Sequence, residues 1–150
     1  MKNENRSLTL SLILTKLLLG GLVATAIVAP YICRIYENTM NIRNEPSVFV
    51  PMLIAVYLGL VAVFPAVFAL HKLLSNIKGK SVFVRQNVQI LRLISYCSFG
   101  VGIVFAGFGV YRSIAFAIAV AALFFGLIMR VLKNVFAAAV TLKEESDLTI

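Results

Sequence analysis

Residues 93–129 read LISYCSFGVGIVFAGFGVYRSIAFAIAVAALFFGLIM, two apolar runs that are separated only by Arg112 and Ser113. A helix needs roughly 20 residues to cross about 30 Å of hydrocarbon, and the runs 93–111 and 114–129 approach or reach that length. Two linking residues leave no room for a long connection. The sequence therefore predicts an antiparallel hairpin of two membrane-spanning helices, the second of which continues beyond residue 129.

Small residues recur along both runs at helical spacings of three and four. The predicted helix-packing residues are Gly102, Ala106 and Gly109 in the first run and Ala115, Ala119, Ala122 and Gly126 in the second. Apolar surface gains little by association within lipid, so close backbone approach along such stripes is a principal source of helix adhesion. The stripes predict a compact bundle, although the same residues could form a face between copies of the chain.

Two further apolar runs, residues 17–35 and 48–70, precede this hairpin. Of the 150 residues, 61% are apolar and 13% are charged. In a typical soluble domain, about 45 to 50% of the residues are apolar and about 25% are charged. This composition excludes most soluble classes, and two cysteines exclude a disulfide scaffold. We expect an all-α, integral membrane four-helix bundle with cytoplasmic helical extensions, in which residues 1–150 form a single domain.

The first apolar run has a second interpretation. Basic residues and the triplet Ala24-Thr25-Ala26 resemble a secretory signal. The run continues unbroken past this triplet, which favours a retained membrane span. Residues 8–15 are then predicted to form a short interfacial helix that Ser7 caps, and Gly20, Gly21 and Ala24 to form a smaller packing stripe.

The cations are distributed unevenly between the two sides that four spans define. Eleven of the 14 Lys and Arg residues lie on the side of the termini, and only Arg34, Arg43 and Arg112 lie on the other. Short loops rich in Lys and Arg stay in the cytoplasm. Both termini, the loop 71–92 and the tail 130–150 are therefore predicted to be cytoplasmic in a multi-pass plasma-membrane protein, and the net charge of +8 does not indicate direct nucleic-acid binding.

Local signals divide the second span and the central loop. Pro65 lies inside the second run and predicts a kink. The loop divides at Gly79, after which residues 82–92 repeat apolar side chains at helical spacing. We expect a helix here that Ser81 caps and that continues into the third span.

Groups that could carry chemistry are sparse within the predicted spans. All six acidic residues lie in loops or tails, and His71 lies at a span end. Cys33 and Cys97 are predicted near opposite membrane faces, too far apart for a disulfide, and no metal-ligand spacing occurs. The sequence therefore predicts a protein that is not an enzyme and that has no cofactor or metal.

The segment FVRQNVQILRLI at residues 83–94 and the ending KEESDLTI at residues 143–150 resemble a bacterial family of small four-span proteins, domain-of-unknown-function family number 2975. The resemblance rests most on Phe83, Asn87, Leu91, Arg92 and Asp147-Leu148-Thr149, whereas Ser146 departs from the expected Asn. Membership would imply a bacterial plasma membrane and, commonly, a neighbouring gene for a small helix-turn-helix regulator. It would imply no established activity.

Two functions compete. In the first, the cytoplasmic surface docks a partner such as a small helix-turn-helix transcription regulator. The candidate docking residues are Phe83, Asn87, Leu91, Arg92, Phe136, Glu144, Glu145, Asp147 and Leu148. In the second, the spans form a small transporter, a channel subunit or a protective protein against membrane-active peptides. A water-filled pathway between the helices would favour this alternative.

Overall fold

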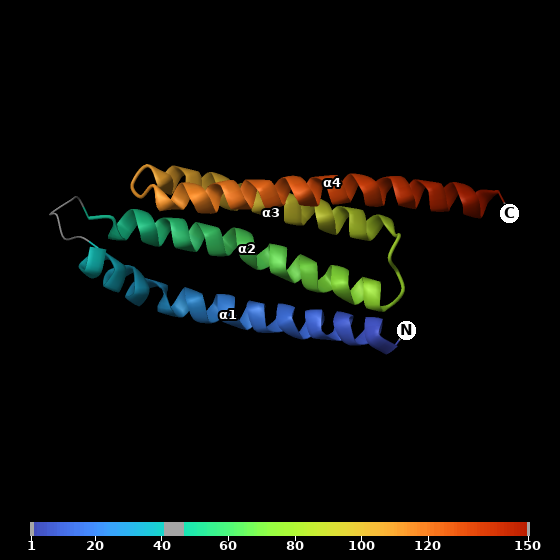
Figure 1. Ribbon diagram of the computed structural model, residues 1–150, viewed down its shortest axis with the longest axis horizontal. Coiled ribbons are helices and arrows are strands. Elements are labelled where there is room, and N and C mark those ends of the chain that lie inside the picture. Colours follow the sequence, from blue (N-terminus) through green and yellow to red (C-terminus); the bar gives the residue numbers. More distant parts are fainter. Residues whose placement is uncertain (1, 41–46, 150) are drawn as a thin grey trace.

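The computed structural model describes residues 2–40 and 47–149, which form four helices joined in an up-and-down order. The helices are α1 (Lys2–Met40), α2 (Phe49–Lys78), α3 (Arg85–Gly109) and α4 (Ile114–Leu148). They lie side by side along one direction, and both termini lie at the same end (Figure 1). All four are long and apolar enough to cross a membrane. The all-α class and the four predicted membrane helices are therefore confirmed.

The two ends of the molecule differ in what they contain. We call the end that holds the two termini and the α2–α3 connection the termini end, and the other end the turn end (Figure 1). At 1.5 Å per residue, the 39 residues of α1 and the 35 of α4 measure about 58 Å and 52 Å. Both exceed the roughly 30 Å of hydrocarbon, so both helices extend well outside it.

Helix boundaries differ from the sequence-based expectations in three places. Residues 8–15 are not a separate helix, because α1 is continuous from Lys2 and Ser7 lies inside it. The central connection is short, since α2 continues to Lys78 and α3 begins at Arg85. Ser81 does not cap α3, because Val84 holds the N-cap position without a side-chain hydrogen bond.

The helices pack in sequence order: α1 on α2, α2 on α3, and α3 on α4. Within the described residues, α1 makes no close backbone contact with α4, so the bundle is open rather than closed. Pro65 lies inside α2, which remains helical on both sides of it, and Pro30 lies inside α1 in the same way. The middle position of α3 makes it the most buried helix: 39% of its most apolar segment is buried, against 11% for α1.

Candidate docking site at the termini end

The turn between α2 and α3 is fixed by the fully buried side chain of Asn87. Its Nδ2 donates hydrogen bonds to the carbonyl oxygens of Ser81 at 2.8 Å and Val82 at 2.7 Å. Its Oδ1 accepts one at 2.8 Å from Nδ2 of Asn76 on α2. A buried amide with three such bonds satisfies backbone groups that the short turn leaves unpaired, so it defines the path of residues 79–84.

A hydrophobic cluster lies beneath this turn and joins three helices. Its buried members are Ala69 and Leu73 of α2 and Ile90, Leu91 and Ile94 of α3. Met129 and Phe136 of α4 pack against the cluster. Phe136 also meets Phe83 of the turn, with ring centroids 5.8 Å apart, a separation favourable for an aromatic pair. The part of α4 that follows residue 129 is therefore packed against the protein rather than free.

One ion pair attaches α4 farther along. Nε and Nη2 of Arg85 donate hydrogen bonds to the two carboxylate oxygens of Glu144 at 2.8 Å and 2.7 Å. Glu144 follows Ile114 by 30 residues, about 45 Å along the helix, so the pair lies outside the hydrocarbon. The hydrogen bonds from Arg85, together with its positive charge, lower the pKa of the Glu144 carboxyl. Because both side chains are solvent-accessible, the pair orients α4 more than it stabilises the fold.

The end of α4 beyond this ion pair is exposed. Glu145, Asp147 and Leu148 are all accessible, and the side chain of Leu148 is 86% exposed. In Figure 1 the C-terminal part of α4 extends past the end of every other helix. These residues form an acidic helix end with an uncovered apolar side chain.

The structure does not place the nine predicted docking residues on one surface. Asn87 and Leu91 are buried, at 0% and 3% exposure, because one fixes the turn and the other fills the hydrophobic cluster. Their interpretation as docking residues is therefore wrong. Arg92 is exposed but lines a separate concavity with Tyr96 and Arg130, whereas Phe83 packs against Phe136. The sequence pattern identified helical periodicity but not which face is covered.

The predicted packing residues lie mainly between α3 and α4. An added Cβ at Gly102 would lie 2.6 Å from two side-chain atoms of Leu123, and one at Gly109 would lie 2.7 Å from the ring of Phe116. At Gly126 it would lie 3.2 Å from the ring of Phe99. Ala115 and Ala119 are buried, Ala106 is half-buried, and the half-buried Ala122 lines a cavity. Close approach of α3 and α4 therefore depends on the glycines.

Gly20 and Gly21 behave differently. An added Cβ at either position would have no neighbouring atom within 4 Å, and Ala24 is exposed. The predicted packing stripe on α1 therefore meets no other helix within the described part of the chain. Two polar contacts that the sequence analysis missed join α1 to α2 instead. Tyr57 donates a hydrogen bond to the carbonyl of Ala26 at 2.9 Å, and the Thr15 hydroxyl lies 2.8 Å from Nδ1 of His71.

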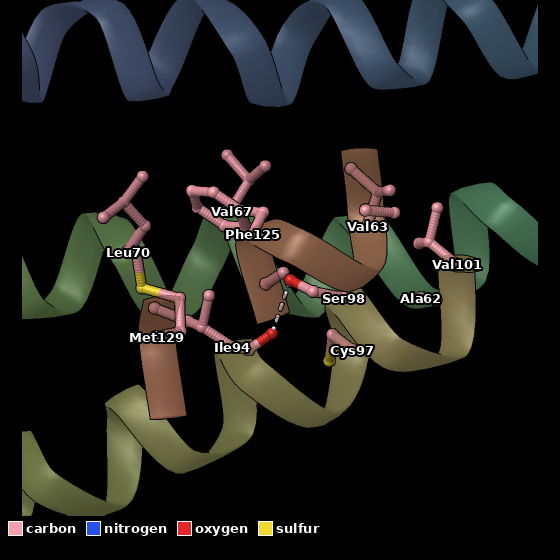
Figure 2. Close-up of a pocket in the computed structure, with 12 residues that line it drawn as sticks. Ala62, Val63, Val67, Leu70, Ile94, Cys97, Ser98, Val101, Phe125 and Met129 are labelled. Carbon is pink, nitrogen blue, oxygen red and sulfur yellow. Dashed lines mark hydrogen bonds between the residues drawn. The ribbon is translucent and has the colours of Figure 1, made fainter. Parts of the chain in front are cut away.

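A cavity of about 310 Å³ opens between α2, α3 and α4 (Figure 2). Apolar side chains such as Val63, Val67 and Phe125 line it. Its one hydroxyl, on Ser98, donates a hydrogen bond to the carbonyl of Ile94 at 2.9 Å, the dashed line in Figure 2. This lining differs from the water-filled pathway that the transporter alternative requires, because it offers water no unpaired polar group.

Cys97 also lines this cavity, and Cys33 is buried on α1; neither thiol is in a disulfide. Over residues 2–40 and 47–149, the His, Cys, Asp and Glu side chains form no group of three that could hold a metal ion.

Four long apolar helices with polar segments at one end define a multi-pass membrane protein. The family described as "Protein of unknown function (DUF2975)" matches residues 34–150, and the chain belongs to that family. The suspected resemblance is thus confirmed. No curated protein and no solved structure matches the chain.

Proposed function

We propose that this membrane protein holds a soluble partner at its termini end, which faces the cytoplasm of a bacterial cell. The distribution of cations along the sequence supports this orientation: 11 of the 14 Lys and Arg residues belong to the side of the termini in the predicted threading, and cationic loops remain inside the plasma membrane. The proposal assigns the protein a binding role without catalysis.

The observation that carries the proposal is the fixed projection of α4. Phe136 packs against Phe83 and the hydrophobic cluster, and Glu144 is held by Arg85, so the helix is fixed almost to its end. A fixed helix presents its last side chains with little loss of conformational entropy on binding. Glu145, Asp147 and Leu148 then offer two negative charges beside an apolar contact.

The chemistry of this surface favours a basic partner with a small apolar recess. A small helix-turn-helix regulator fits, because DNA-binding proteins carry an excess of Lys and Arg that the acidic helix end attracts. Holding such a regulator at the membrane would lower its free concentration at DNA.

The test is affinity capture of the full chain from native membranes. We expect a small DNA-binding protein to copurify with the wild type and to be reduced at least tenfold by the variant E145A/D147A/L148A. The matched control is T141A/K143A/T149A, which changes two exposed positions in the last turns of α4 and its exposed C-cap residue. Equal recovery with all three chains would refute the docking role, provided that thermal unfolding shows the variants to be folded.

A further inference from the structure

A second surface at the termini end lies on the α3–α4 pair, apart from Glu145, Asp147 and Leu148. Arg92, Ser95 and Tyr96 of α3 and Arg130 and Lys133 of α4 line a shallow concavity, which we call the basic concavity. Its volume of about 30 Å³ has room for an anionic oxygen atom rather than a whole soluble ligand. We propose that the basic concavity binds the phosphate of an anionic phospholipid headgroup.

The contact between α3 and α4 brings the cations together. The hydroxyl of Ser95 donates a hydrogen bond to the carbonyl of Gly126 at 2.9 Å, which fixes the two backbones close to one another. Arg92 precedes Ser95 by three residues and Arg130 follows Gly126 by four, so each lies one helical turn from this contact. Lys133 adds a third positive charge from the next turn of α4.

These three charges are uncompensated. Among the described residues, none of the three side chains has a hydrogen bond or an ion pair with another residue, and Arg92 and Arg130 are exposed. On α4, the first acidic residue after Lys133 is Glu144, which follows it by 11 residues and already forms an ion pair with Arg85. Three neighbouring cations without a counterion favour binding of an anion.

The position of the basic concavity along the membrane normal points to a lipid as the source of that anion. Arg92 precedes Gly109 by 17 residues and Arg130 follows Ile114 by 16, which places them about 26 Å and 24 Å from the α3–α4 turn. With the hydrocarbon about 30 Å thick, long basic side chains at this depth reach the headgroup phosphates.

The neighbouring surface of α3 fits the rest of a lipid. Tyr96 and Ile103 follow Arg92 by four and 11 residues, along one face of the helix. Tyr96 is 64% exposed and Ile103 is 70% exposed. An acyl chain of the bound lipid would lie along this face toward the membrane centre. The proposal does not depend on the docking of a soluble partner.

Native mass spectrometry of the delipidated full chain in detergent micelles tests this assignment with phosphatidylglycerol and phosphatidylcholine of identical acyl chains. We expect phosphatidylglycerol to bind at least tenfold more tightly. The variant R92Q/R130Q/K133Q should reduce its affinity to that of phosphatidylcholine. K72Q/K78Q/K80Q should retain it, because these three cations lie at the same end but outside the basic concavity.

Equal binding of the two lipids by the wild type would overturn the proposal, and so would equal losses in the two triple variants. Displacement of phosphatidylglycerol by millimolar inorganic phosphate would identify a free anion as the ligand and would also overturn it. Should the site variant fail to fold, K133Q alone decides the question: about fivefold weaker binding of phosphatidylglycerol supports the proposal, and unchanged binding refutes it.

Discussion

The α3–α4 hairpin and the α1–α2 pair show two ways in which neighbouring helices associate. In the hairpin, glycines at 102 and 109 face large side chains of the opposite helix at distances that leave no room for a Cβ, and Gly126 faces one at a distance that leaves little. In the α1–α2 pair, Gly20 and Gly21 face no atom within 4 Å, and the two described polar contacts join the helices through side chains. A small residue therefore promotes close packing only where a partner helix brings a complementary large residue.

The largest expected effect tests the hairpin directly. Gly102→Val adds a Cβ into space that Leu123 already fills, so overpacking should destabilise the protein by about 3 kcal/mol. Gly20→Val is the matched control, because the same side chain there points into open space and should cost less than about 1 kcal/mol. Thermal unfolding of both variants in the same detergent measures the difference. Similar losses would remove the contrast between the two helix pairs.

A substitution in the α2–α3 turn, which connects the α1–α2 pair to the α3–α4 hairpin, should have the next largest effect on the free energy of unfolding. Asn87→Ala removes three hydrogen bonds made by a fully buried side chain and leaves the carbonyls of Ser81 and Val82 without this donor, at a cost of about 2 kcal/mol. Asn38→Ala, at an exposed position on α1, serves as the control and should unfold like the wild type. If Asn87→Ala also unfolds like the wild type, the turn is fixed by the hydrophobic cluster rather than by the buried amide.

A smaller loss is expected where α1 meets α2. Besides its contact with the carbonyl of Leu12 in its own helix, the Thr15 hydroxyl shares a 2.8 Å hydrogen bond with Nδ1 of His71 on α2. Thr15→Val removes this bond with little change of volume and should cost about 0.6 kcal/mol, an average value for hydrogen bonds between membrane helices. Thr25→Val is the control, because that hydroxyl bonds only within its own helix, to Gly21. Denaturant titration measures the free energy of unfolding of both variants. If Thr15→Val lost as much stability as Gly102→Val, the contrast between the α1–α2 pair and the hairpin would be contradicted.

The smallest effect concerns the exposed end of α4. Arg85 lowers the pKa of Glu144, so the ion pair contributes stability fully above the ordinary carboxyl pKa and loses it as the pH falls through the lowered value. Acidification should therefore lower the hydrogen-exchange protection factor, the ratio of the intrinsic to the observed exchange rate at each pH, for residues 140–148 in the wild type. Glu144→Gln should exchange faster at neutral pH and lack this acid-dependent step, whereas Glu145→Gln should behave as the wild type. Identical profiles for the wild type and Glu144→Gln would show that apolar packing alone holds this segment.

The sequence predicted the four spans, the hairpin and the family, because apolar length, a two-residue link and local motifs are properties of the chain itself. It did not predict which helix faces are covered. Asn87 and Arg92 belong to one helical segment, yet the first is fully buried and the second is exposed beside Arg130. Gly20 and Gly102 likewise look alike in sequence and differ completely in their surroundings.

These differences depend on which helix lies opposite each residue. In a lipid environment almost every face of an apolar helix is compatible with exposure, so hydrophobic periodicity does not distinguish a protein contact from a lipid contact. Only the tertiary structure places α3 between α2 and α4 and leaves α1 in contact with α2 alone. The chain determined that it spans a membrane four times, whereas helix packing decided where its cations meet and which part of α4 stays uncovered.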